Sequence, residues 1–525
     1  MERKRAFWMH IGVDVGGTNT DAVLLDGTDV LAFVKSPTTD DVGSGVVSAI
    51  KTILEQSGTD AARIESVMIG TTQFTNAFVE GKKLVPVAVF RAALPATESV
   101  RPMVEFPDHL TRQIGTQSYL VNGGYEFDGR IIAPLDEKAV AAGAKDMKAK
   151  GIKSAVLSGV FTPINSAMED RMAEIILNEA PDTVLTASGE IGRIGLIERE
   201  NAAIMNASLC DLSHIVVNAF RDALRELNII CPLFVSQNDG TLMTAEFAEK
   251  YPVLTFASGP TNSMRGAAFL SGESDAIVAD IGGTTTDTGV LIGGFPRESA
   301  ISVDIGSVRT NFRMPDVLAA GLGGGSHVRD DGNRIGPDSV ALDLLTEAMV
   351  FGGQTLTTTD IAVAAGYADV GDSSLVKHLD KALVNRAVDR MHAMVEEATD
   401  RVKSTQGEVP VILVGGGSVL INRDIRGASQ VIRPEKSGVA NAIGAALAQV
   451  GGEVDKVFSY DKIGREEAME EARQSAIERA VDAGASPDTT KIVSLEEMPL
   501  TYLPAGAVRI KVKAIGDLAP AGEAS

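Results

Sequence analysis

Two short segments carry the residue types best suited to phosphate chemistry. "DVGGTNTDAVLL" begins at Asp14 and "DIGGTTTDTGVL" begins at Asp280, and seven of their twelve aligned positions are identical. Backbone N–H groups and hydroxyls in such a turn can bind phosphate oxygens. The leading aspartate fits beside them if a Mg²⁺ ion lies between it and the phosphates. One such turn is more often an ordinary hairpin, whereas two near-copies favour a duplicated phosphate clamp.

The residues around these segments predict how they are positioned. Strand-like apolar runs precede and follow each turn, which is typical of two β-hairpins. A duplicated domain explains the repeat, with two similar lobes that each contribute one hairpin to a central cleft. We expect Asp14 and Asp280 to hold the metal, mostly through water. The expected phosphate ligands are Gly16, Gly17, Thr18, Asn19, Gly282, Gly283, Thr284 and Thr285.

Length and composition limit the class of protein. A chain of 525 residues is long enough for two or three domains. Its net charge of −22 argues against a nucleic-acid partner, because phosphates would be repelled. The two cysteines form no CxxC pair, and no apolar run approaches about 18 residues. We read no signal peptide in the basic start, so we expect a cytoplasmic protein without a membrane span.

Other common catalytic motifs are missing from the sequence. The six histidines include no HxH or HExxH pattern, so a zinc site made of protein ligands has no support. There is no G-x-S-x-G elbow for an acyl-serine enzyme, and no GKS or GKT that would complete a P-loop. Among the histidines, His327 lies in the glycine-rich stretch "GGGSHV". It could reach a substrate from there, or serve in a turn or cap.

A third glycine-rich motif completes a recognisable order. The apolar run "VILVGGGSVLI" follows both hairpins and contains Gly415, Gly416 and Gly417. Two phosphate hairpins followed by such a strand resemble the actin, sugar-kinase and heat-shock ATPase superfamily. The resemblance implies an α/β fold with two duplicated ribonuclease-H-like lobes around a nucleotide cleft. It also implies that these three glycines face the adenosine.

Four further stretches narrow the resemblance to the hydantoinase/oxoprolinase family. They occur in the family's order within a match that spans residues 10 to about 450. The sequence departs from the family pattern at two places, Ile69 where it has His and "TNS" at 261–263 where it commonly has AGG. The stretches are "IGTTQFTNAFVEGKK" at 69–83, "SQNDGTLMTAEFAEKYPVLTFASGP" at 236–260, "AAGLGGGSHV" at 319–328 and "RIGPDSV" at 334–340.

This resemblance implies an activity. The chain is similar to the short ATP-binding A subunit, which family members combine with a second, hydrolytic polypeptide. ATP and Mg²⁺ would then phosphorylate the carbonyl oxygen of a cyclic amide, and hydantoin, 5-oxoproline and other lactams all stay open. Asp239, Asn238 and His327 are candidates on the substrate side. A small-molecule kinase and a non-enzymatic, nucleotide-driven conformational protein are the alternatives, and a homo-oligomer is compatible with each.

The chain divides into three predicted regions. Residues 1–187 form the first lobe, 188–450 the second, and 451–525 a small αββ appendage. A long helix over Ile194–Leu209 joins the lobes, and its Arg199 and Asn206 either line the cleft or lie on a solvated face. In the last strand, Arg509, Lys511 and Lys513 alternate with apolar residues. That basic face is either solvated or docks an acidic partner.

Overall fold

The computed structural model describes residues 9–17, 19–39, 41–299, 302–447, 449–501 and 506–519. Two of its sheets repeat one strand order, in which an antiparallel hairpin is followed by a parallel neighbour of its first strand. In the first sheet the order is β3 (Asp29–Pro37), β2 (Asn19–Asp26), β1 (Met9–Val15), β4 (Ile64–Thr71) and β9 (Leu233–Ser236). In the second it is β13 (Phe295–Pro296), β12 (Thr286–Ile292), β11 (Ala276–Ile281), β19 (Val409–Val414) and β20 (Ala428–Ile432), with β16 (Val317–Ala320) beside β12.

This repetition confirms the predicted fold of two duplicated α/β lobes. Helices cover the faces of both sheets, as expected when strands and helices alternate along the chain. The first sheet packs against α1 (Val42–Ser57), α14 (Ala440–Leu447) and, behind α1, α8 (Cys210–Glu226). The second packs against α10 (Ser258–Ser271) and α13 (Lys381–Val402).

Helices α10 and α14 lie against each other where the two lobes meet. A Cβ atom added at Gly266 of α10 would lie 1.9 Å from the carbonyl oxygen of Ala440. One added at Gly444 of α14 would lie 1.8 Å from the carbonyl oxygen of Asn262. Only glycine therefore permits this backbone approach, and it fixes the distance between the lobes.

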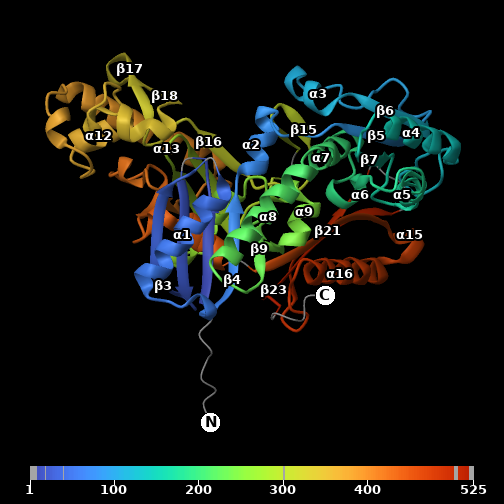
Figure 1. The fold of residues 1–525 in the computed structure, drawn as a ribbon. Helices are drawn as coiled ribbons and strands as arrows, with labels where there is room; N and C mark the ends of the chain where they lie inside the picture. Colours follow the sequence, from blue (N-terminus) through green and yellow to red (C-terminus); the bar gives the residue numbers. More distant parts are fainter. Residues whose placement is uncertain are drawn as a thin grey trace, which may run out of the picture.

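A third sheet is parallel throughout and lies at the far end of the molecule from β17 (Ser326–Arg329) and β18 (Arg334–Ser339) (Figure 1). Its strands in order are β6 (Gln117–Asn122), β5 (Val87–Leu94), β7 (Ser154–Gly159) and β8 (Val184–Ala187). Helices α4 (Glu137–Ala149), α5 (Ala167–Glu179) and α7 (Leu196–Ser208) pack on it. The other helices between β4 and α8 in the chain are α2 (Gln73–Glu80), α3 (Asp108–Ile114) and α6 (Ser188–Ile191).

The strand pairing differs from the predicted division of the chain at two places. Strands β9 and β10 (Leu242–Thr244), which the sequence placed in the second lobe, pair within the first sheet. The predicted C-terminal helix and strands form, but the strands extend the same sheet to nine instead of standing apart. These elements are β21 (Val450–Ser459), α15 (Tyr460–Ile463), α16 (Arg465–Asp482), β22 (Lys491–Pro499) and β23 (Ala507–Gly516).

The remaining helices and strands lie in the second lobe and in the segments that link the sheets. They are α9 (Ala245–Lys250), β14 (Val303–Ile305), β15 (Val308–Thr310), β17 (Ser326–Arg329), β18 (Arg334–Ser339), α11 (Leu344–Glu347) and α12 (Thr358–Ala364). Among the described residues, no single helix is long and apolar enough to cross a bilayer. Helices α7 and α8 together are long and apolar enough by length and composition alone, but the pair bends by 52° at the break between them.

Candidate active site between the two lobes

One cavity of about 610 Å³ lies between the two repeated sheets. Its lining brings together most of the residues predicted as phosphate, metal and adenosine ligands. The predicted residues that line the cavity are Asp14, Gly16, Asn19, Asp280, Gly282, Gly283, Gly415, Gly416 and Gly417. Gly17, Thr284 and Thr285 belong to the same turns but do not line it, and Thr18 lies outside the described residues.

The two predicted hairpins have the same internal geometry. In the first turn, Gly16 N–H donates to the carbonyl of Asn19 at 2.9 Å, and in the second Gly282 N–H donates to Thr285 at 2.8 Å. The strand register pairs Asp14 with Asp21 and Asp280 with Asp287. The repeat in sequence is therefore a repeat in structure.

Glycine-rich loops hold the second hairpin in place. Gly324 and Gly325 N–H groups donate to the carbonyls of Gly282 and Gly283 at 3.0 and 2.7 Å. From the other side, Gly417 N–H donates to the carbonyl of Ile281 at 2.7 Å. The GGGS-type loop after β16 thus supports the turn that faces the cavity, which gives its glycines a structural reason.

The sequence gave no role to Lys35 and Asn441, which also line the cavity together with Ser263 of the "TNS" departure. Lys35 Nζ lies 2.8 and 2.6 Å from the two carboxylate oxygens of Asp21. Asn441 Nδ2 lies 3.0 Å from Asp14 Oδ2 and 2.9 Å from Asp21 Oδ2, so it bridges the pair. Asn441 is polar within the otherwise apolar helix α14, and this contrast is the signal that could have identified it.

The carboxyl groups of the cavity are buried close to one another. Burial, then the negative charge of Asp21, raises the pKa of Asp14 to about 6. Burial also raises the pKa of Asp280. Burial and the charge of Asp280 raise the pKa of Asp287 to about 7. A cation placed among these groups would favour their ionised forms, so the residues present fit a Mg²⁺ ion bound with phosphate.

Part of the cavity lining is apolar and suits a flat, uncharged ring. Its members are Leu344, Phe351, Tyr367 and Val419, and Gly415–Gly417 line the same cavity. Aromatic and aliphatic side chains of this kind form most of the lining in small-ligand pockets. The adenosine motif predicted from the sequence therefore lies beside a surface that could accept a nucleobase.

Two predicted substrate-side residues lie away from this cavity. Asp239 is fully buried, 2.8 Å from Lys513 Nζ and 3.1 Å from Arg313 Nη1. Burial alone would raise its pKa, but the charges of Arg313 and Lys513 hold that pKa below its ordinary value. His327 on β17 contacts Arg329, with 2.8 Å between Nδ1 and Nη2. Neither residue lines the cleft, so a substrate-side role at these two positions finds no support in the geometry.

Two other expectations from the sequence are wrong. Arg199 and Asn206 of α7 neither line the cleft nor face solvent, because both are buried and donate to nearby backbone carbonyls. The basic strand face of β23 also lies inward. Lys511 pairs with Glu298, and Arg509 Nε donates to Asp455 Oδ1 at 2.6 Å. The alternation of residues in β23 correctly predicted which side chains share the basic face. It did not predict that acidic residues of the same chain pack against that face.

Comparison with protein-family models gives two matches to this chain. The hydantoinase/oxoprolinase N-terminal region matches residues 10–180, and the hydantoinase/oxoprolinase model matches residues 199–372. Caprolactamase subunit alpha of Pseudomonas jessenii is 24% identical over 421 residues, which cover 74% of this chain and 58% of that protein. The acetophenone carboxylase gamma subunit of Aromatoleum aromaticum is 26% identical over 397 residues, 68% of this chain and 53% of that protein. The chain thus spans a little over half the length of these relatives.

Solved structures share the fold over nearly the whole chain. The ATP-dependent caprolactamase from Pseudomonas jessenii superposes with a TM-score of 0.76 at 20% identity, covering 97% of this chain and 88% of that one. The nucleotide-free structure of acetone carboxylase gives a TM-score of 0.68 at 18% identity, covering 99% and 89%. Identities this low establish a common architecture and leave the chemistry to be argued from the site.

Proposed function

Because the chain belongs to the hydantoinase/oxoprolinase family, we propose that it binds ATP in the cleft and phosphorylates the carbonyl oxygen of a cyclic amide. The observation that carries this proposal is the pair of matched turns at Gly16 and Gly282, which face one cavity with Asp14 and Asp280 beside them. A nucleotide that spans the cavity would have its phosphates near the turns and its base near Phe351 and the glycine motif.

The proposed chemistry addresses a specific difficulty. Amide resonance makes the carbonyl carbon a poor electrophile. Once its oxygen carries a phosphoryl group, that oxygen becomes a leaving group and the C–N bond can be hydrolysed. Transfer of the γ-phosphoryl group depends on positioning and on electrostatic stabilisation of the charge on its oxygens.

The chain's own residues divide this work. The backbone N–H groups of the two turns would hold the phosphates. Burial raises the pKa of Asp21 beside them, and the charge of Lys35 opposes that rise. Asp14 and Asp280 would hold a Mg²⁺ ion, mostly through water, and that ion would neutralise charge on the phosphates. The amide nitrogen of Asn441 keeps the Asp14 carboxylate oriented toward the cavity.

We further propose that ring opening takes place on a second polypeptide. The relatives that support this idea are named as subunits: caprolactamase alpha, acetophenone carboxylase gamma and acetone carboxylase beta. Hydrolysis of the activated amide also needs a positioned nucleophile, usually a metal-bound water or an acid/base pair. In this division of labour, the present chain activates the amide and its partner opens the ring.

The purified chain should bind Mg²⁺–ATP by calorimetry and should open no ring in a panel of hydantoin, 5-oxoproline and caprolactam. Addition of the partner should then give substrate-dependent ADP and a ring-opened acid. A stable phosphorylated product would instead indicate a small-molecule kinase. Slow ATP turnover that ignores every substrate would indicate a nucleotide-driven conformational protein. Complete hydrolysis by the isolated chain would contradict the division between two polypeptides.

A substitution outside the cavity lining tests whether Asp14 must be held in place. A Cβ atom added at Gly70 of β4 would lie 2.5 Å from Asp14 Oδ1 and 2.4 Å from Asn262 Nδ2. Gly70→Ala should therefore displace the carboxylate and lower ATP turnover by about 10²-fold, since a shift of roughly 1 Å can have that effect. Gly407→Ala, whose Cβ meets nothing within 4 Å, is the matched control. Equal ATP turnover in the two variants would contradict the proposed role of Asp14.

A further inference from the structure

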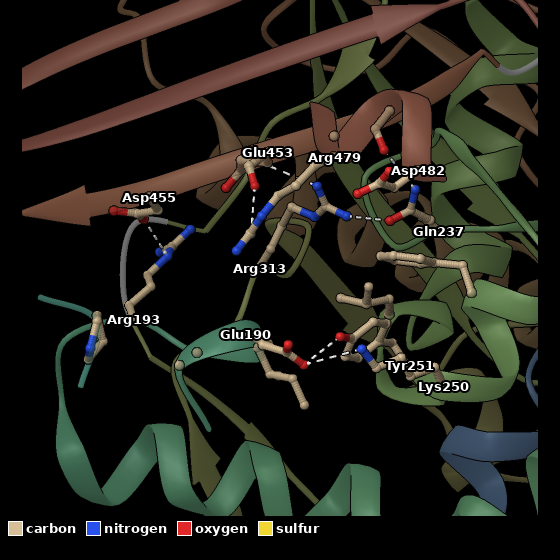
Figure 2. A pocket seen from close by; sticks show the side chains of 18 of the residues that line it. Glu190, Arg193, Gln237, Lys250, Tyr251, Arg313, Glu453, Asp455, Arg479 and Asp482 are labelled. Atoms are coloured by element: carbon tan, nitrogen blue, oxygen red, sulfur yellow. Dashed lines mark hydrogen bonds and ion pairs between the residues drawn. The ribbon is translucent and has the colours of Figure 1, made fainter. Parts of the chain in front are cut away.

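A second cavity, of about 310 Å³, shares no lining residue with the cleft between the lobes. Residues from α6, α9, β21 and α16 surround it, and Figure 2 shows their charged side chains converging on the space. Its volume lies at the lower end of the range for small-ligand pockets, which begins at about 300 Å³. It can therefore accept a compact ring but not a nucleotide of the size proposed for the cleft.

The inner end of this cavity contains a rigidly held arginine. Arg313 Nη2 donates to Gln237 Oε1 at 2.7 Å, and Arg313 Nε donates to Asn238 Oδ1 at 3.2 Å. Its Nη1 lies 3.1 Å from Asp239 Oδ2. These contacts occupy three of the five N–H groups of a guanidinium. The side chain is thus fixed, and further donors stay available for a ligand.

Beside it lies the carboxylate of Glu453, which Arg313 and Lys511 accompany as ion pairs but which keeps one oxygen without a hydrogen bond. The Glu453 side chain is 9% exposed, and its Oε2 atom has no hydrogen-bond partner among the described residues. The nearest Arg313 nitrogen is 3.7 Å from Oε2, which is too long for a hydrogen bond. Burial and the charge of Glu298 raise the pKa of Glu453 above its ordinary value. A buried acceptor without a hydrogen bond is unfavourable, so a donor from a ligand would stabilise it.

Acceptor and donor lie side by side at this point. Glu453 Oε2 can accept one hydrogen bond, and 3.7 Å away Arg313 Nη1 can donate another. A ligand that carries a donor and an acceptor on one edge can satisfy both, and an N–H beside a C=O is such an edge. A cyclic amide does so because its ring holds the amide cis. An open-chain secondary amide presents them on opposite edges, because its trans form is strongly favoured over the cis form.

We propose that this cavity is a second ligand site, which binds a cyclic amide by its cis edge through Glu453 and Arg313. The choice of cyclic amide rests on the proposed function of the chain, whereas the site itself is new. Because its lining is separate from that of the cleft, the ring binds without nucleotide. Thr261 Oγ1 lies 3.4 Å from the carbonyl of Gln237, and Asn262 Nδ2 lies 3.4 Å from Asp14 Oδ1. The first turn of α10 therefore touches both sites.

The test is calorimetric titration of the nucleotide-free chain with 2-piperidinone, N-methyl-2-piperidinone and N-methylacetamide. The lactam should bind at least 10-fold more tightly than the other two, because one lacks the N–H donor and the other is trans. This comparison needs no substitution, so it stands even if a variant fails to fold. Equal affinity for the three probes, or no binding of the lactam, would overturn the proposal whether or not the chain binds ATP.

Glu453→Gln supplies the second arm. It keeps the shape but removes the charge of the acceptor, so affinity for 2-piperidinone should fall about 10-fold while affinity for Mg²⁺–ATP stays unchanged. Glu496→Gln, on the exposed face of β22, is the matched control and should alter neither. Unchanged lactam affinity in Glu453→Gln would show that the ring binds elsewhere. If the wild-type chain binds no ATP, that result would count against the proposed function and not against this site.

Discussion

Asp280→Asn is expected to lower ATP turnover by about 10²-fold or more while the fold stays intact. The substitution keeps the shape of the side chain but removes a negative charge from a buried group that lines the cleft. Stabilisation of phosphate charge through a metal is worth several kcal/mol, and the amide of Asn cannot replace a carboxylate in that role. We expect the same outcome for Asp14→Asn, because Asp14 holds the matching position in the first hairpin.

The measurement is steady-state ADP release with the partner and a responsive cyclic amide, alongside circular dichroism to check the fold. Asp29→Asn is the matched control, because Asp29 is exposed at the end of the β2–β3 hairpin away from the cleft. It should leave turnover unchanged. Near-wild-type turnover in Asp280→Asn would rule out the phosphate clamp and, with it, the proposed site of the reaction.

Arg91→Met is expected to destabilise the third sheet by about 3–5 kcal/mol, because it leaves a buried carboxylate without its counter-ion. Arg91 on β5 is 0% exposed and Glu200 on α7 is 1% exposed. Two hydrogen bonds of 2.7 and 2.6 Å join the guanidinium to the carboxylate, and Ser158 Oγ donates to the same group. This pair fixes α7 to the parallel sheet.

The unfolding of this unit can be followed by hydrogen exchange of the β5 and β7 amides in increasing urea. Replacement of both partners by methionine should recover part of the loss, since the desolvation cost then disappears. Arg225→Met breaks a pair whose side chains are 75% and 69% exposed, and it should change stability by less than about 1 kcal/mol. Similar losses of stability in Arg91→Met and Arg225→Met would mean that the buried ion pair contributes no more than the exposed one.

The repeated turns could be predicted from the sequence because their information is local. Gly16 and Gly282 lie in near-identical segments, and each makes the same hydrogen bond across its turn. The placement of both turns on one cavity followed from the idea of duplication. The flanking strands form as predicted, and the glycine-rich motif at Gly415 lines the same cavity.

What the sequence missed depends on contacts between distant residues. Asn441 reaches Asp14 across 427 positions of the chain, and no local pattern announces such a pairing. Asp239 became a substrate-side candidate because it is an extra carboxylate in the stretch at 236–260 that resembles a family segment, yet Lys513 pairs with it from the last strand. In the same way, alternation in β23 showed two faces without showing which acidic side chains meet the basic one.

The nine-stranded sheet has a consequence for the order in which the chain can fold during synthesis. Its strands β1 to β4 emerge first, but β21 and β23 follow only after the whole second sheet, whose strands lie between Ala276 and Ile432. The second lobe can complete its pairing as soon as it leaves the ribosome. The first must wait with an unpaired edge at β10, and such long-range closure is slow and prone to aggregation. The last strands made are thus the ones that cover this edge and complete the first lobe.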